Sequence, residues 1–199
     1  MQFNSYVFIL AFIPIILIGY FGLNRIHLVF GKVFLIAASA VFYIYGGWNI
    51  AIILGISILI NYIFAKIVEI SRNNKTIVRL AIFIIVVGNI GLLFYYKYYN
   101  FFVSSINDIL HMNFALKDII LPLGISFFTF QQIMYVVNVY KNNIQSAKIL
   151  DYLVYILYFP KLLMGPLNEP KEFLDQINNP SLKKLNAENL ACGDMLPSR

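Results

Sequence analysis

Long uncharged apolar runs, separated by short polar segments that carry lysines and arginines, make up most of the chain. A helix of about 20 apolar residues is long enough to cross the hydrocarbon core of a bilayer. The pattern therefore predicts an all-α protein, a polytopic transmembrane helical bundle of about five to six spans plus interfacial amphipathic helices. The expected spans are residues 5–23, 28–45, 50–65, 77–96, 119–140 and a shorter run over 149–164.

Proline, glycine and polar residues mark where these runs bend or turn. Pro14 predicts a kink in the first span, and the Gly46-Gly47 pair predicts a tight turn after the second. Between residues 97 and 111 polar side chains recur every three or four positions, which predicts a helix lying along the membrane interface. Residues 171–177 predict another surface helix.

Composition and charge agree with a membrane protein. Hydrophobic residues make up 60% of the chain and charged residues only 12%, against about a quarter in soluble domains. The net charge of +6 is concentrated in short loops, which favours contact with membrane lipid headgroups and no nucleic acid partner. The basic loops at 66–79 and 141–148 are predicted to be cytoplasmic. A single cysteine, Cys192, and two isolated histidines, His27 and His111, predict no metal site.

The fifth predicted span keeps three amides, Gln131, Gln132 and Asn138, where a membrane is expected to be dry. Helical spacing of four and three places Gln131, Tyr135 and Asn138 on one stripe. Buried amides are costly without hydrogen-bonding partners. The stripe either lines a hydrophilic path or holds a neighbouring helix by hydrogen bonds, and the residues alone leave both interpretations open.

A second cluster lies in the sixth run, which is short for a crossing and contains Pro160 and Lys161, followed by Gly165 and Pro166. A proline within an apolar run frees a backbone carbonyl, and a nearby lysine can neutralise an anionic group. The alternative is that Lys161 extends its ammonium to the interface. The run is predicted to be re-entrant or broken.

Two segments together resemble the membrane-bound O-acyltransferase family. They are LPLGISFFTFQQIMYVVNVYKN at 121–142 and YFPKLLMGPL at 158–167, and the similarity is greatest to the branch with the alginate O-acetyltransferase membrane subunit and the teichoic-acid D-alanyl transfer protein. AASAVFYIYGGWN at 37–49, YYKYYNFF at 95–102 and NEPKEFLDQI at 168–177 match in the expected order.

The resemblance implies a multi-pass protein of the bacterial inner membrane that moves an acyl group, more specifically acetyl, to a hydroxyl of an extracellular or cell-wall polysaccharide. The implied donor is acetyl-CoA or an acyl-carrier protein, with a cytoplasmic donor protein and an extracytoplasmic polysaccharide-modifying protein as partners. Gln131, Tyr135 and Asn138 would line or brace the acyl tunnel. Its cytoplasmic mouth would be shaped by Pro160, Lys161, Gly165 and Pro166.

The chain departs from the family near its end. Residues 1–190 are interpreted as the N-terminal portion of such a membrane domain, and the polar tail at 191–199 as the result of a truncation or frameshift. The family's general-base histidine belongs to a later helix, and neither His27 nor His111 matches it, so no catalytic residue is assigned. The alternatives are a non-enzymatic membrane transport or assembly subunit, and an inactive truncated product.

Overall fold

The computed structural model describes residues 10, 12–122, 124–158 and 169–179, and the regular structure within these ranges is helical, without strands. The helices are α1 (Ile13–Ile26), α2 (Leu28–Gly46), α3 (Trp48–Ile70), α4 (Lys75–Leu93), α5 (Tyr99–Leu110), α6 (Ile125–Tyr140), α7 (Ile149–Leu157) and α9 (Pro170–Asn178). A π-helical turn, Phe94–Tyr98, joins α4 to α5. The predicted all-α membrane fold is confirmed.

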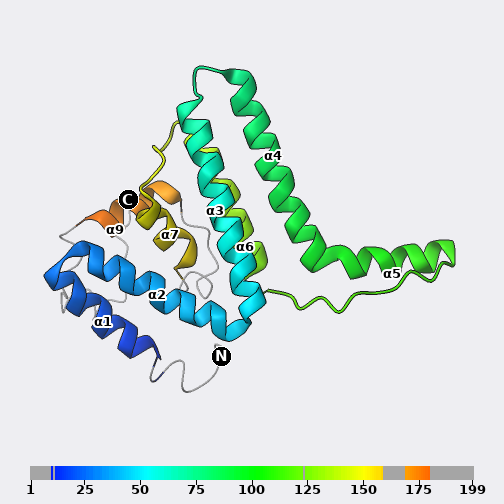
Figure 1. Ribbon diagram of the computed structural model, residues 1–199, viewed down its shortest axis with the longest axis horizontal. Helices are drawn as coiled ribbons and strands as arrows, with labels where there is room; N and C mark the ends of the chain where they lie inside the picture. The colour runs from blue at the N-terminus through cyan, green and yellow to red at the C-terminus, as the bar shows by residue number, and fades with distance from the viewer. Residues whose placement is uncertain (1–9, 11, 123, 159–168, 180–199) are drawn as a thin grey trace.

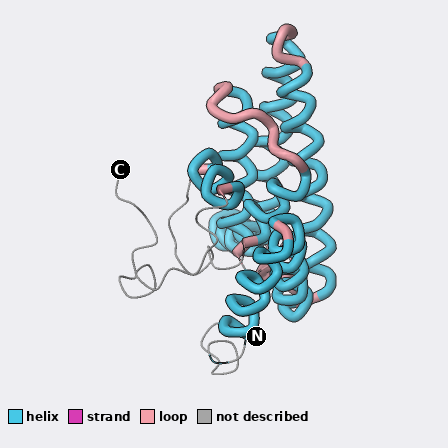
Figure 2. The backbone as a smooth tube through the Cα atoms, turned by 90° about the vertical axis from the view of Figure 1, so that its left-hand side faces the viewer, coloured by secondary structure: helices cyan, strands magenta, loops and turns pink. Residues whose placement is uncertain are grey.

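Helices α3, α4 and α6 pack against one another at the centre of the molecule, with α1, α2, α7 and α9 to one side (Figure 1). The view at right angles shows the central helices running side by side (Figure 2). By length and composition, α2, α3 and the continuous helix from Lys75 to Leu110 could each cross a membrane. The other apolar helices in the described part of the chain are shorter, so three of the expected spans have full length here.

The fifth predicted span is shorter at its start than the sequence analysis expected. Helix α6 begins at Ile125 and has 16 residues, whereas residues 119–122 are not helical. Pro122 disfavours helical backbone in the residue before it, and Gly124 takes a left-handed conformation with φ of 72° at the helix start. Pro122 and Gly124 therefore form a break before α6, and the prediction of a helix from residue 119 was wrong.

Two further prolines illustrate how position decides a proline's effect. Pro14 lies in the first turn of α1, a position that tolerates a missing N–H, and the kink expected there stays a prediction because residues 1–9 and 11 lie outside the described ranges. Pro170 likewise opens α9, which confirms the surface helix predicted over 171–177. The sixth apolar run forms only α7, nine residues long, before residue 159, and residues 159–168 lie outside the described ranges.

The helix predicted over 97–111 forms as α5 and leaves the bundle as an arm (Figure 1). Two amides on the polar side of α5 form hydrogen bonds to the chain segment that leads from α5 back to α6. Asn100 bonds the N–H and carbonyl of Lys117 at 3.0 and 2.7 Å, and Asn107 bonds those of Phe114 at 2.9 Å each. The arm and its return segment are thereby one unit.

The α3–α4 turn and the 141–148 loop meet at one end of the bundle. Glu69 accepts from Lys66 Nζ at 3.1 Å and from the Ser146 backbone N–H at 2.9 Å, and Lys66 also donates to the Ser146 carbonyl at 3.3 Å. The two basic loops that the sequence analysis assigned to a common side therefore lie together.

Replacing Gly47 with alanine is expected to lower stability by about 1–3 kcal/mol, because φ of 142° at this residue is a conformation that L side chains rarely adopt. The midpoint of thermal unfolding in detergent measures the loss. Gly88→Ala is the control, since a Cβ there meets nothing within 4 Å and alanine favours helices. Equal midpoints for the two variants would contradict the strain at Gly47.

Candidate functional site

Four buried polar side chains join the three central helices halfway along their length. Ser57 Oγ and Asn61 Nδ2, both on α3, donate to Gln132 Oε1 of α6 at 2.8 and 2.7 Å. Asn89 Nδ2 of α4 donates to Asn61 Oδ1 at 2.8 Å. The two asparagines also donate to the carbonyls four residues earlier, Ser57 O at 2.9 Å and Ile85 O at 2.8 Å. We call Ser57, Asn61, Asn89 and Gln132 the amide network.

The amide network fixes how α3, α4 and α6 pack. All four of its members are at most 7% exposed. In an apolar surrounding each amide group costs several kcal/mol if it is unpaired, whereas an interhelical hydrogen bond contributes about 0.6 kcal/mol and at most about 1.7. Sliding one helix by a turn would break these bonds without replacing them, so the network sets the register of the bundle.

Two hydrogen-bonding groups on α6 are buried beside the network and have no partner among the described residues. They are Thr129 Oγ1 and Gln132 Nε2, one helical turn apart. An amide N–H donates and a hydroxyl both donates and accepts. Each is a buried hydrogen-bonding group that the described residues leave without a partner, and such a group can bind a carbonyl oxygen, a hydroxyl or a water.

The stripe of Gln131, Tyr135 and Asn138 does not act as one surface. Gln131 and Tyr135 are 2% and 0% exposed. Asn138 is half-buried, donates to the Met134 carbonyl at 2.9 Å and accepts from Asn143 at 2.9 Å, so it braces the end of α6. The predicted tunnel role of these three residues stays a prediction. Pro160, Lys161, Gly165 and Pro166 lie outside the described residues.

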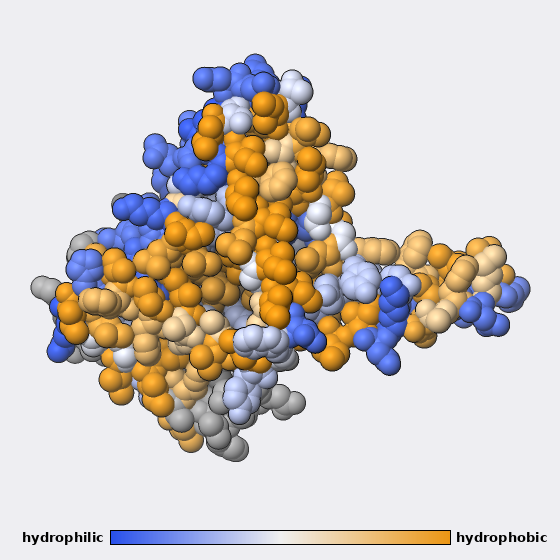
Figure 3. All heavy atoms as spheres, in the orientation of Figure 1, coloured by the Kyte–Doolittle hydropathy of each residue, from blue (hydrophilic) through white to orange (hydrophobic). Residues whose placement is uncertain are grey.

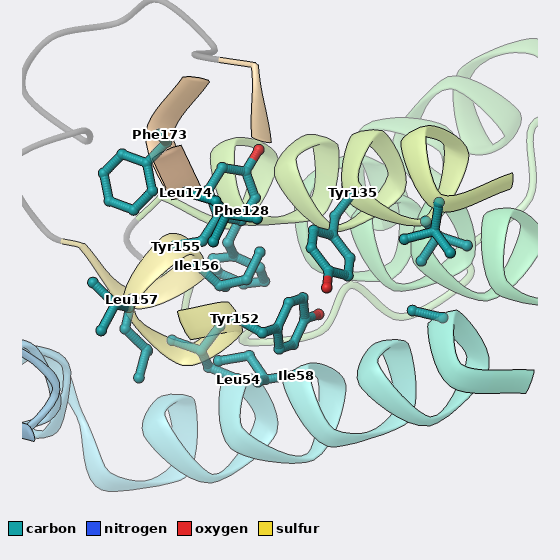
Figure 4. Close-up of a cluster of buried hydrophobic side chains, with 14 of the residues drawn as sticks. Leu54, Ile58, Phe128, Tyr135, Tyr152, Tyr155, Ile156, Leu157, Phe173 and Leu174 are labelled. Atoms are coloured by element: carbon teal, nitrogen blue, oxygen red, sulfur yellow. The ribbon is translucent and has the colours of Figure 1, made fainter. Parts of the chain in front are cut away.

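Tyr135 belongs to a cluster of buried tyrosines between α3, α6 and α7. Its ring centroid lies 4.6 Å from that of Tyr152 and 6.0 Å from that of Tyr155, while Tyr62 lies 5.3 Å from Tyr152. Figure 4 shows Tyr135 and Tyr152 pointing toward one another among apolar side chains. The Tyr135 hydroxyl accepts from the Ala147 N–H at 2.8 Å, whereas the buried Tyr152 hydroxyl has no partner within the described ranges.

A buried ion pair connects α2, α7 and α9. Lys32 Nζ lies 2.5 Å from Asp151 Oδ1 and donates to Asn178 Oδ1 at 2.6 Å. Lys32 is only 7% exposed. Because Lys32 is neutralised by a carboxylate inside the protein, its charge gives no information on which loop faces the cytoplasm.

Part of this site could have been predicted from two further amides in the sequence. Asn61 and Asn89 are isolated amides within long apolar runs, just as Gln132 is, and such residues mark polar contacts inside a bundle. Nothing local could identify the pairing of Lys32 with Asp151, because 119 residues separate them. His27 accepts from the Val29 N–H at the start of α2, and His111 ends α5.

Comparison with known proteins finds relatives that are named as O-acetyltransferases or O-acetylases of polysaccharides. The chain is 33% identical to the peptidoglycan O-acetyltransferase of Helicobacter pylori over 96% of this chain and 41% of that protein. It is 32% and 31% identical to the probable alginate O-acetylases AlgI of Pseudomonas aeruginosa and Pseudomonas putida, over 90% of this chain and 35% and 37% of theirs. No protein-family model and no solved structure matches the chain. The chain therefore spans about two fifths or less of these relatives.

Asn61→Leu and Asn89→Leu are expected to be non-additive. Either change alone takes away the hydrogen bond that joins the two asparagines and leaves the remaining amide without that interhelical partner, and the second change removes that cost. A double-mutant cycle on unfolding in mixed micelles should give a coupling of about 1 kcal/mol. Asn49→Leu, at an exposed position, should add to Asn61→Leu without coupling. Purely additive asparagine variants would contradict the network.

Lys32→Met is expected to lower stability by about 3–5 kcal/mol, because it leaves the Asp151 carboxylate buried and uncompensated. Adding Asp151→Leu should restore most of that loss, since the double variant carries no buried charge. Folded protein recovered after extraction, and its unfolding midpoint, measure both changes. A double variant less stable than Lys32→Met would show that the two residues are not paired.

Proposed function

Since this chain belongs to the membrane-bound O-acyltransferase family, we propose that it takes part in transferring an acetyl group to hydroxyls of a polysaccharide outside the cytoplasm. The observation that carries the proposal is the similarity to O-acetyltransferases of peptidoglycan and alginate over 90–96% of this chain. No observation on the described residues favours a transport subunit instead.

The proposed location is the bacterial inner membrane, with several crossings of the chain. Three helices of crossing length support it. The clustering of the two basic loops at one end of the bundle supports a single cytoplasmic side, because basic loops remain in the cytoplasm. The donor would be an acetyl thioester on that side, either acetyl-CoA or an acyl-carrier protein, and a polysaccharide-modifying partner would act on the other.

The reaction requires a polysaccharide hydroxyl to attack the thioester carbonyl. The carbon–oxygen bond of the ester forms, the carbon–sulfur bond breaks, and the hydroxyl proton leaves to a base while the thiol departs. Negative charge develops on the carbonyl oxygen, so hydrogen-bond donors in an apolar surrounding favour the transition state. The described residues supply no identified base, and no catalytic residue is assigned to them.

The part that we assign to this region is to build one wall of the acyl path. Thr129 Oγ1 and Gln132 Nε2 are buried, lack partners in the described ranges, and stand on the helix that the sequence analysis connected with the path. Gln131 and Tyr135, next to them on α6, would line or brace the same wall, while Asn138 holds its end. The amide network keeps α6 in place against α3 and α4.

Deleting the encoding gene from its source bacterium should reduce the ester-linked acetate released by mild base from purified peptidoglycan or from exopolysaccharide. Restoring the gene should recover it. Gln131→Leu, at normal protein level, should recover markedly less if Gln131 borders the path, whereas Gln145→Leu in the exposed loop should recover all of it.

Unchanged acetate in both polymers after deletion would contradict acetyl transfer. If Gln131→Leu instead restored all of the ester-linked acetate, acetyl transfer would still be supported, and Gln131 would be assigned to helix packing.

A further inference from the structure

The cytoplasmic end proposed for the bundle contains a pocket that acetyl transfer does not use. Its volume is about 360 Å³, and it lies where the α3–α4 turn meets the last residue of α6. The residues that line it are Val68, Arg72, Lys75, Val78, Arg79 and Tyr140. Small-molecule sites range from about 300 to 1,000 Å³, so the pocket could hold a ligand the size of a lipid headgroup.

Three cations surround this pocket, and its lining contains no acidic residue. Within the described ranges the ion pairs are Lys66–Glu69 and Lys32–Asp151, so Arg72, Lys75 and Arg79 form none. Glu69, the nearest acid in sequence, is already bound by Lys66 and by the Ser146 N–H. The lining of the pocket is therefore positively charged, with Glu69 outside it and acting on Arg72 without an ion pair.

The three cations are held close together by the local structure. Lys75 and Arg79 are four residues apart on α4 and share one face, an arrangement in which their like charges repel one another. The α4 N-terminus adds positive potential, but Asn74 caps its Thr76 and Ile77 amides. The donors available to an anion are thus the side chains, and arginine forms paired hydrogen bonds to phosphate oxygens.

Apolar surface directly below the charges favours a lipid over a free anion. Val68 and Val78, 1% and 6% exposed, contribute apolar lining. Further along α4, an apolar face is exposed, comprising Leu80, Phe83, Ile84 and Val87. Figure 3 shows the same order, with hydrophilic residues over the α3–α4 turn and hydrophobic surface beneath them.

We propose that Arg72, Lys75 and Arg79 bind the phosphate of an anionic phospholipid in the cytoplasmic leaflet, with the lipid's acyl chains along α4. Basic pockets between membrane helices on the cytoplasmic side are suited to such headgroups. The chemistry recognised is a phosphate whose negative charge no headgroup ammonium offsets, and the apolar face of α4 selects a source that carries acyl chains. This site is independent of the acetyl-transfer proposal.

The test uses the purified full chain in detergent, with bound lipid counted by native mass spectrometry. Phosphatidylglycerol should bind and phosphatidylcholine should not. The variant R72Q/R79Q should bind phosphatidylglycerol at least about tenfold more weakly, since a hydrogen bond to a charged group contributes about 1.5–3 kcal/mol. K148Q/K171Q removes the same charge at exposed positions outside the pocket and should bind as the unchanged chain does.

A charge-preserving variant and a soluble competitor complete the design. R72K/R79K should retain most of the binding, which separates charge from folding, and unfolding midpoints check every variant. Equal phosphatidylglycerol binding by R72Q/R79Q and K148Q/K171Q would overturn the proposal. Displacement of lipid by pyrophosphate at similar concentration would keep the phosphate site but overturn the lipid as its source.

Discussion

The structure depends on satisfying amides that lie where water is scarce. Asn61 makes the decisive contacts, because its side chain reaches Gln132 on α6 and Asn89 on α4 together with its own helix backbone. Helices in an apolar solvent gain little from burying more apolar surface, so close packing and such hydrogen bonds decide which faces meet. The polar position at Thr129 and Gln132 exists only because this network places α6 against α3.

The buried tyrosines and the buried ion pair fix the positions of the helices outside the central three in the same way. Tyr135 binds the backbone of the 141–148 loop and packs on Tyr152, which connects the bundle to α7. Lys32 and Asp151 then join α7 to α2. A buried polar or charged group without a partner would destabilise the fold. These contacts therefore specify one arrangement of the helices among several that apolar packing alone would allow.

The centre of the bundle and its charged end differ in the chemical groups that they present. The centre of the bundle contains a few buried hydrogen-bonding groups in an apolar setting. Its end offers unpaired cations above apolar surface, which suits a phosphate attached to acyl chains. The relatives are named as a peptidoglycan O-acetyltransferase and probable alginate O-acetylases, and the central site is the part of this chain that we propose to serve acetyl transfer.

The helical membrane class, the turn at Gly47 and the amphipathic α5 could be predicted from the residues, because hydrophobic period and glycine act locally. The sequence also carried the family resemblance, in the blocks around α6 and α7. The packing of the helices was needed to show that Gln132 rather than Asn138 bonds the neighbouring helices, and that Lys32 is buried against Asp151. Those outcomes depend on which side chains meet across distances of 71 and 119 residues, and no local pattern encodes such pairings.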